Sequence, residues 1–242
     1  MRYRIELSYN GKNYHGWQIQ PNAISVQEVL QTAFSTLLNT PISIMGAGRT
    51  DTSVHAEFFV AHFDLDTEIP NTEQLCFRMN HFLPKDIAIH DIRLADEGFR
   101  SRFSATSRTY EYRFHFEKNP FLTYFSYFFQ YELDVEAMEA GAKILFEYTD
   151  FTSFSKVNTD AKTNNCTIMQ AEWFQTQNQL IFKIKANRFL RNMVRAIVGT
   201  LLELGIGKIT LDEFRDIIEQ QDRSKAGKSA PGHALFLTDI EY

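Results

Sequence analysis

The chain has 242 residues, 44% of them hydrophobic and 14% aromatic, and a formal net charge of −5. This length suits one large or two small globular domains with substantial cores. The composition argues against a membrane protein, because no apolar run approaches the roughly 20 residues of a spanning helix. The N-terminus lacks the apolar core of a signal peptide, so we expect a cytoplasmic protein with no membrane partner.

The two cysteines, Cys76 and Cys166, are far apart and form no C-x-x-C pair. Neither a disulfide framework nor a zinc site is therefore predicted. The seven histidines show no metal-ligand spacing either, and we expect no metal and no organic cofactor.

Charge is unevenly distributed along the chain. The stretch 132–150 carries six acidic residues against one lysine, whereas 173–202 has no acidic residue. An acidic outer surface with a basic cleft would admit a polyanion of fitting shape, although a charged run is more often an ordinary solvated face. The basic residues of the second stretch are Lys183, Lys185, Arg188, Arg191 and Arg195.

The first half of the chain reads as β-α-β-β-α-β. Polar and apolar residues alternate in the predicted strands, and apolar residues recur at helical spacing in the predicted helices. Ser25 with Glu28, and Asn71 with Gln74, mark helix starts. The predicted strands are 3–9, 42–45, 57–65 and 87–94, and the predicted helices run from 26 to 38 and from 71 to about 80.

The second half repeats this pattern with one added helix. A polar connector, 100–106, leads into a long alternating strand. The predicted strands are 107–116, 165–175, 179–186 and 234–242; the helices are 134–146, 189–204 and one that starts at Thr210 with Glu213.

Two successive β-α-β-β-α-β units predict an α+β fold of two ferredoxin-like lobes. The antiparallel sheets of these lobes are expected to meet around a central basic cleft, which is where function should lie. The predicted boundaries are 1–105 for the N-terminal lobe and 106–242 for the C-terminal lobe.

The stretch 45–56 is the candidate for chemistry. It joins two predicted strands and contains Gly46, Gly48, Arg49 and Asp51. The glycines would allow positive φ and close backbone approach, so the loop could present a guanidinium and a carboxylate to a ligand. The alternative is an ordinary turn in which Asp51 caps its own backbone. His55 is interpreted as a hydrogen-bonding brace of this loop rather than as a catalytic base.

Two further groups of residues could act with this loop. Arg188, Arg191 and Arg195 are spaced i, i+3 and i+7, so the predicted helix 189–204 would carry them on one face. One of them could keep the carboxylate of Asp51 ionised, as a nucleophile requires; the alternative is that arginine stems merely cover apolar surface. Tyr110 could stack on an unpaired base, whereas Tyr112 is a better candidate for the core.

These residues resemble the tRNA pseudouridine synthase A family. Gly48 to Ala56 is similar to the signature loop of that family, and the similarity extends in order along nearly the whole chain. Ser53 stands where the family usually has glycine, and Arg191-Asn192 stands where two histidines are frequent. The other similar blocks are Tyr9 to Gly11, Gly16 to Gln18, Val26-Gln27, Arg108 to Tyr112, Phe189 to Arg195, Gly199, and Ala230 to Gly232 before Leu235.

The resemblance implies the pseudouridine synthase fold and conversion of uridines 38, 39 and 40 of the tRNA anticodon stem-loop to pseudouridine. It implies a homodimer that binds tRNA without metal or cofactor. By the same resemblance Asp51 is the catalytic aspartate, Tyr110 packs against the target base, and Arg195 pairs with Asp51. Arg49 would help to displace the target nucleotide. Apart from the resemblance, we expect Arg188 and Arg191 to bind substrate as basic residues of the predicted cleft.

Two other functions fit parts of the same pattern. A non-catalytic RNA-binding protein needs only the basic and aromatic residues, but a carboxylate in an RNA groove would then only repel phosphate. A carboxylate-using N-glycosidase would release free uracil.

Overall fold

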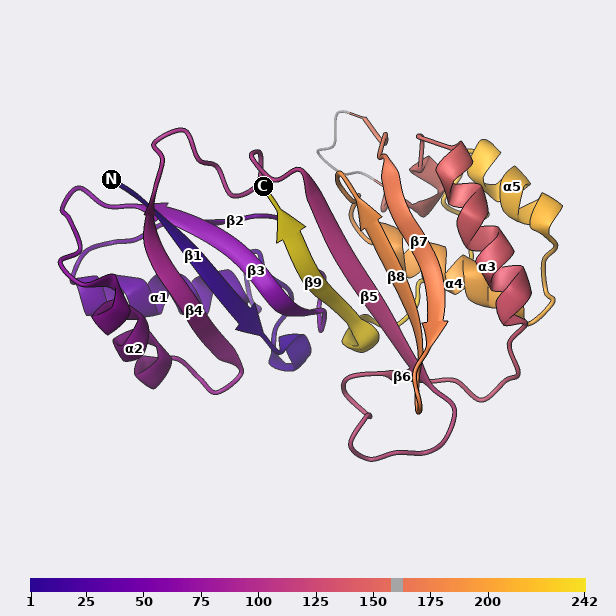
Figure 1. Ribbon diagram of the computed structural model, residues 1–242, viewed down its shortest axis with the longest axis horizontal. Coiled ribbons are helices and arrows are strands. Elements are labelled where there is room, and N and C mark those ends of the chain that lie inside the picture. Colours follow the sequence, from indigo (N-terminus) through magenta and orange to yellow (C-terminus); the bar gives the residue numbers. More distant parts are fainter. Residues whose placement is uncertain (158–162) are drawn as a thin grey trace. The chain divides into compact units, whose positions relative to one another are not determined.

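The structure, a computed structural model, describes residues 1–157 and 163–242 (Figure 1). The chain forms two compact units. The first unit contains Met1–Thr106 and Phe236–Tyr242, and the second contains Ser107–Leu235. Each unit places helices on a mostly antiparallel sheet, so the predicted α+β fold is confirmed.

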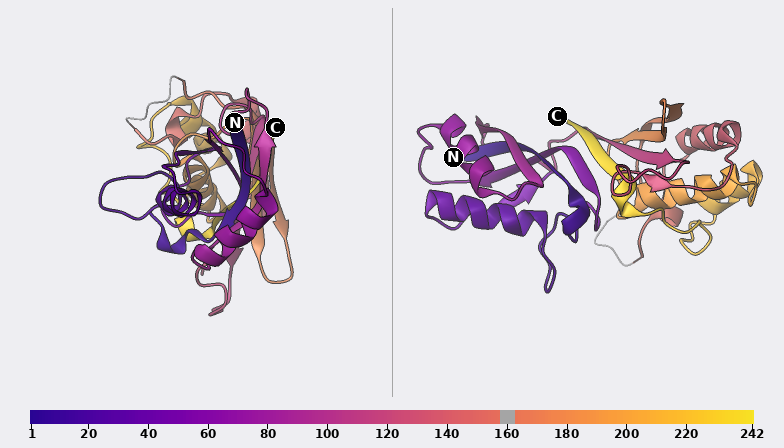
Figure 2. Two further views of the ribbon diagram at one scale, coloured as in Figure 1. Left: turned by 90° about the vertical axis from the view of Figure 1, so that its left-hand side faces the viewer. Right: turned by 90° about the horizontal axis from the view of Figure 1, so that it is seen from below.

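The first unit follows the predicted β-α-β-β-α-β order. Strand β1 lies between β3 and β4 and is antiparallel to both, and β2 extends the sheet on the far side of β3. Helices α1 and α2 cover one face of this sheet (Figures 1 and 2). The elements are β1 (Arg2–Tyr9), α1 (Val26–Leu38), β2 (Ile44–Gly46), β3 (His55–Asp64), α2 (Thr72–Phe82) and β4 (Ile87–Ala95).

Both helices of this unit begin where the sequence predicts. The hydroxyl of Ser25 accepts a hydrogen bond from the backbone of Glu28 at 3.3 Å, and the side chain of Asn71 accepts one from Gln74 at 2.8 Å. These bonds satisfy backbone N–H groups that have no partner within the helix. Alternation along β1 places Tyr3, Ile5, Leu7 and Tyr9 in the core.

The second unit is built on three antiparallel strands in the order β5-β8-β7, with the short β6 parallel to β5. Helix α3 packs on β7 and on α4, whose apolar residues are almost all buried. Strand β6 was not predicted. The elements are β5 (Ser107–His115), β6 (Tyr127–Phe128), α3 (Val135–Ile144), β7 (Ile168–Gln175), β8 (Leu180–Ala186), α4 (Met193–Gly205) and α5 (Leu211–Glu219).

Helix α4 begins at Met193, four residues later than predicted. The reason is Asn192, whose φ of 68° belongs to the left-handed region and cannot continue a right-handed helix. Its side-chain amide donates to Ser229 Oγ at 2.7 Å, and the carbonyl of Arg191 accepts from Lys156 at 3.0 Å. Phe189 and Leu190 extend the apolar spacing to positions before Asn192, which is why periodicity alone predicts a helix start that is too early.

The closing strand β9 (Leu235–Glu241) groups with the first unit, whereas the predicted boundary places it in the C-terminal lobe. It pairs in parallel with the start of β3, with His55 opposite Phe236. Tyr242 directly follows this strand. Its hydroxyl donates to the carbonyl of Ser101 at 2.8 Å, and its ring centre lies 4.6 Å from Cζ of Arg4. These contacts join residues far apart in sequence, and local patterns do not reveal them.

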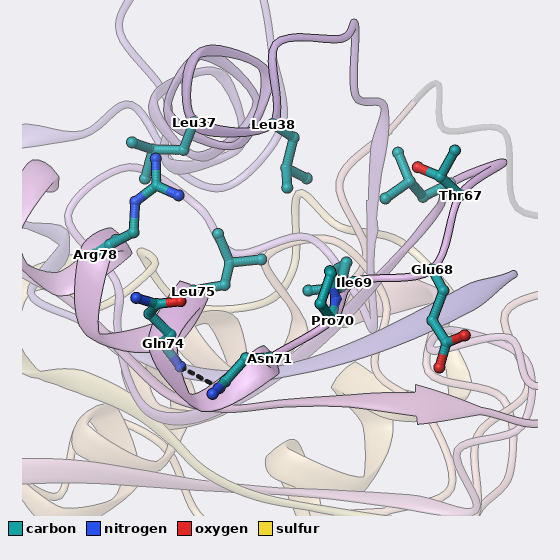
Figure 3. Close-up of a pocket in the computed structure, with 11 residues that line it drawn as sticks. Leu37, Leu38, Thr67, Glu68, Ile69, Pro70, Asn71, Gln74, Leu75 and Arg78 are labelled. Carbon is teal, nitrogen blue, oxygen red and sulfur yellow. Dashed lines mark hydrogen bonds between the residues drawn. The ribbon is translucent and has the colours of Figure 1, made fainter.

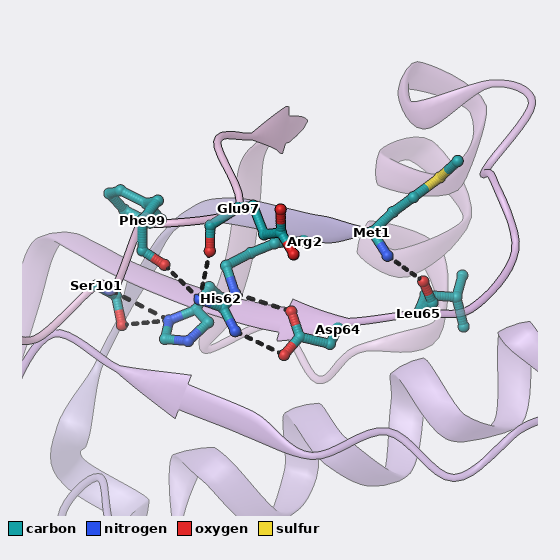
Figure 4. Close-up of polar contacts among 8 residues, drawn as sticks. All are labelled: Met1, Arg2, His62, Asp64, Leu65, Glu97, Phe99 and Ser101. Carbon is teal, nitrogen blue, oxygen red and sulfur yellow. Dashed lines mark hydrogen bonds and ion pairs between the residues drawn. The ribbon is translucent and has the colours of Figure 1, made fainter.

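The segment 96–106 between β4 and β5, which includes the predicted connector 100–106, is held on the sheet of the first unit by polar contacts (Figure 4). Arg2 forms an ion pair with Asp64 at 2.8 Å and donates to the carbonyls of Glu97 and Phe99. The backbone N–H of Ser101 donates to His62 Nδ1 at 3.2 Å, and its hydroxyl donates to the carbonyl of Met45 at 2.8 Å.

His62 therefore accepts a bond at Nδ1 and is held neutral. Burial, and then the positive charge of Arg2, lower the pKa of His62 below its ordinary value near 6.5. In the unfolded chain this histidine takes up a proton near its ordinary pKa, whereas the folded chain resists protonation.

We predict that the free energy of unfolding falls as the pH drops from about 6.5 towards the lower folded-state pKa of His62, because the unfolded state binds more protons in that window. His62→Asn keeps a side-chain acceptor but does not titrate. Urea unfolding between pH 7 and pH 5 should show a shallower loss of stability for this variant, and equal slopes would contradict the prediction.

Candidate active site

Asp51 lies in the loop between β2 and β3, which folds as a tight turn. The backbone N–H of Val54 donates to the carbonyl of Asp51 at 3.1 Å, and Ser53 has a φ of 64°. Glycine at positions 46 and 48 would allow a positive φ, but neither residue adopts one; the left-handed residue of this loop is Ser53. Gly46 is instead needed for packing, since a Cβ there would lie 2.5 Å from the ring of Trp17.

A second loop, 10–17, holds this turn from one side. The N–H of Trp17 donates to the carbonyl of Thr50 at 3.2 Å, and the N–H of Ser53 donates to the carbonyl of Tyr14 at 3.2 Å. Backbone hydrogen bonds thus fix Thr50, which directly precedes Asp51, and Ser53, which lies two residues after it.

Close approach of the two loops depends on glycine. Gly16 has a φ of 91°, and a Cβ there would lie 2.3 Å from the carbonyl oxygen of Thr50. At Gly11 a Cβ would lie 2.0 Å from the carbonyl oxygen of Val54. No larger residue fits at either position without moving the turn.

Side chains complete the brace. The backbone N–H of Gly11 donates to His55 Nδ1 at 3.1 Å, and the buried imidazole stacks on Phe236 with ring centres 4.6 Å apart. The interpretation of His55 as a brace is confirmed, and Nδ1, which already accepts a hydrogen bond, is poorly placed to act as a base. The Tyr9 hydroxyl lies 2.9 Å from Thr50 Oγ1.

The two candidate functional residues of this loop reach the surface. Asp51 is half-buried and Arg49 is exposed, whereas Thr50 between them is buried. The turn therefore presents a carboxylate and a guanidinium from a backbone that is anchored beneath them. Such a rigid backbone suits a functional group that must keep one geometry.

In the second unit, Tyr110 lies on β5 opposite Ile184. Its ring meets Phe189 edge to face, with centres 5.2 Å apart and an interplanar angle of 87°. Tyr112, two residues on, is fully buried and donates to the carbonyl of Pro231 at 2.8 Å. The expectation that Tyr112 belongs to the core is confirmed.

Arg195 lies in the first turn of α4 and is half-buried. Its Nε donates to the carbonyl of Ala230 at 2.7 Å, and the N–H of Ala230 donates to the carbonyl of Arg195 at 2.9 Å. Gly199 allows this segment to approach the helix, because a Cβ there would lie 1.9 Å from the carbonyl oxygen of Lys228. The guanidinium is thereby held at a defined place.

Arg188 and Arg191 do not share a helix face with Arg195. Both precede α4, and the left-handed Asn192 separates them from it, so the i, i+3, i+7 argument is wrong for this segment. Arg188 is half-buried and Arg191 is exposed. A substrate-binding role for Arg188 and Arg191 therefore has no support from helical spacing.

A cavity of about 400 Å³ lies in the first unit, between the end of α1, the start of α2 and the segment 65–70 (Figure 3). Leu38, Ile69 and Leu75 supply apolar walls, and Glu68 and Arg78 supply charge. None of the predicted site residues lines this cavity.

Sequence reasoning missed the clamp around Asp51. Nothing in the spacing of Tyr9, Gly16 and Trp17 along the sequence shows that they contact Thr50. Within residues 1–157 and 163–242, no group of three or more His, Cys, Asp or Glu residues is arranged to hold a metal ion. The same residues contain no helix long and apolar enough to cross a membrane.

Comparison with known proteins identifies the family. A family model described as tRNA pseudouridine synthase matches residues 148–242. A tRNA pseudouridine synthase A from Parabacteroides distasonis is 53% identical over 241 residues, which cover 100% of this chain and 96% of that protein. This chain belongs to the tRNA pseudouridine synthase A family.

Other members of the tRNA pseudouridine synthase A family match over the full chain as well. The protein of that name from Bacteroides thetaiotaomicron is 52% identical over 100% of this chain and 90% of its own length. The Bacillus subtilis protein is 41% identical over 100% of this chain and 99% of its own length. The similarity thus includes the Asp51 loop, which lies outside the segment matched by the family model.

We predict that Gly16→Ala destabilises the first unit by more than about 2 kcal/mol, because the new methyl group meets backbone and the φ is strained. Gly48→Ala is the matched control, since no atom lies within 4 Å of a Cβ there. It should change the free energy of unfolding by less than about 1 kcal/mol. Equal urea midpoints for the two variants would show that the loops are not clamped at Gly16.

Proposed function

We propose that this chain converts uridine to pseudouridine at positions 38, 39 and 40 of the tRNA anticodon stem-loop. Membership of the tRNA pseudouridine synthase A family supports a tRNA-modifying isomerase. The observation that carries the proposal is the anchored turn, which presents a half-exposed Asp51 beside the exposed Arg49.

The reaction is an internal rearrangement. The bond between N1 of uracil and C1′ of ribose breaks, the base rotates, and C5 bonds to C1′. N1 gains a proton and C5 loses one, so no electrons enter or leave. This balance is consistent with our proposal that the enzyme uses no cofactor and no metal.

Asp51 is the proposed nucleophile. An ionised carboxylate can add to the ribose or to the base, or it can take the 2′ proton of the sugar; each route allows the glycosidic bond to break. All three require the carboxylate at a fixed distance from the nucleotide. The hydrogen bonds on both sides of Asp51 support such a role, because they restrict its backbone.

Tyr110 and Arg195 are the proposed partners of Asp51. Tyr110 would pack against the target base and move a proton, and its half-exposed ring, held edge-on by Phe189, suits stacking. Arg195 would form an ion pair with the carboxylate, and its bond to Ala230 would fix the direction of the guanidinium.

Substrate binding is assigned to Arg49, Tyr110, Arg188 and Arg191. The target base must leave the stack at a cost of a few kcal/mol, and arginine contacts to phosphates would offset that cost. Arg49 would help to displace the nucleotide. We further propose a cytoplasmic homodimer in which one tRNA contacts both subunits. In each subunit the N-terminal lobe would supply the Asp51 loop, and the C-terminal lobe would supply the Tyr110 strand and the Arg195 helix.

Asp51→Asn should lower the rate of pseudouridine formation by about 10³-fold or more, because the amide cannot act as nucleophile or base. Its affinity for tRNA should not fall, since the variant removes a negative charge from a surface that binds a polyanion. The rate can be read as tritium released from C5 of labelled uridine in an anticodon stem-loop. Asp66→Asn, an exposed acid of the same unit, is the control and should keep full activity.

Product formation by Asp51→Asn at the wild-type rate would refute the catalytic assignment. The same assay separates the two other functions. Tight binding of the stem-loop by the wild-type protein without tritium release would indicate a non-catalytic RNA-binding protein. Free uracil in the supernatant would indicate an N-glycosidase.

A further inference from the structure

We propose that Tyr9 and Thr50 are positioning residues, whose paired hydroxyl groups set the place of the Asp51 carboxylate. This inference rests on the proposed function, because it assumes that Asp51 acts on the nucleotide. Neither residue is expected to touch the substrate, since Tyr9 is 3% exposed and Thr50 is 7% exposed.

Thr50 is held from three directions. Its Oγ1 lies 2.9 Å from the hydroxyl of Tyr9, and its carbonyl accepts from Trp17 N–H at 3.2 Å. Gly16 packs directly on the peptide that joins Thr50 to Asp51. A Cβ at position 16 would lie 2.3 Å from the carbonyl oxygen of Thr50 and 3.1 Å from the carbonyl carbon of Asp51. The backbone that leads into Asp51 is therefore fixed by a side-chain bond, a backbone bond and packing.

Tyr9 connects this backbone to the rigid part of the unit. It is the last residue of β1, where it pairs with Ala56 on β3 and Ile87 on β4. Its ring packs against a stacked aromatic pair: the ring centres of Phe59 and Trp17 lie 5.6 Å and 6.2 Å from that of Tyr9 and 4.1 Å from each other. A hydroxyl carried by a central strand moves little, so it is a reliable reference point for a loop.

The hydroxyl pair adds direction to this packing. Both groups are buried, and removal of one leaves the other without this bond. Because a hydrogen bond is directional, it selects one rotamer of Thr50 and ties this residue, which directly precedes Asp51, to the hydroxyl of Tyr9. Packing alone would tolerate a small rotation of the turn, which would swing the Asp51 side chain.

A small displacement is enough to affect catalysis. A shift of about 1 Å in a reacting group can lower a rate by about 100-fold while leaving binding intact. The inference therefore predicts a loss in kcat with little change in KM. A residue that matters only for folding would instead lower the amount of active enzyme and leave the kcat of the folded fraction unchanged.

The experiment compares four single variants, and the double variant that combines Tyr9→Phe with Thr50→Val, by tritium release from the anticodon stem-loop, at a temperature where circular dichroism shows each one folded. Tyr9→Phe and Thr50→Val each remove one hydroxyl, whereas Thr50→Ser retains it. Tyr3→Phe is the matched control: Tyr3 lies on the same strand, is 1% exposed, and its hydroxyl accepts a bond from Ile69 N–H at 2.9 Å.

We expect Tyr9→Phe and Thr50→Val to lower kcat by about 10-fold or more, with KM within about three-fold of wild type. Thr50→Ser and Tyr3→Phe should stay within about three-fold of the wild-type kcat. The double variant should be about as slow as either single variant, because the two hydroxyls act as one unit.

A wild-type kcat in both Tyr9→Phe and Thr50→Val would overturn the inference, and so would an equal loss in Tyr3→Phe, which would reveal general destabilisation. Asp51→Asn is assayed alongside. If it stays active, the proposed function itself fails; if it is inactive while Tyr9→Phe and Thr50→Val keep full rates, only the positioning role fails.

Discussion

The clamp between the loop 10–17 and the turn at Asp51 is the constraint on which the rest of the site depends. Backbone bonds hold Thr50 and Ser53 on either side of the aspartate, and Gly11 and Gly16 allow two backbones to meet where any side chain would collide. The chain thereby tolerates a left-handed Ser53, a conformation that favours glycine and costs on the order of 1–3 kcal/mol. Strain of this kind persists only where the surrounding contacts fix the backbone, as they do here.

A similar arrangement recurs in the second unit. Arg195 and Ala230 exchange two hydrogen bonds, and Gly199 allows the segment around Lys228 to lie directly against α4. In each unit a second segment binds the backbone next to a charged side chain, Asp51 in one and Arg195 in the other. A glycine allows the close approach of the two backbones in both cases. The roles that we propose for Asp51 and Arg195 each require a side chain with little freedom, and the structure provides a local cause in each case.

Local patterns predicted much of this fold. Alternation along β1 and the caps at Ser25 and Asn71 identified elements whose stability is encoded within a few residues. The sequence also singled out Asp51 and His55. The sequence predicts the start of α4 too early, because Phe189 and Leu190 fit the apolar spacing of the helix. The left-handed φ of Asn192 excludes both residues from the helix, and apolar spacing does not reveal this angle. The sequence did not single out Ser53 as the left-handed residue of the loop, because a glycine only permits a positive φ and does not show where the turn requires one. The contacts of Tyr9 with Thr50 and of Trp17 with Gly46 join residues 41 and 29 positions apart, so no local pattern could reveal them.

The central claim is that the clamped turn presents the Asp51 carboxylate to the target nucleotide. A crystal structure of the Asp51→Asn protein bound to an unmodified anticodon stem-loop RNA tests it most directly. The account predicts a uridine turned out of the stack with its ribose or its base in contact with the side chain at position 51, and Thr50 still bound to Tyr9 and Trp17. A uridine bound elsewhere, or a turn that has released Tyr9 and Trp17, would contradict it.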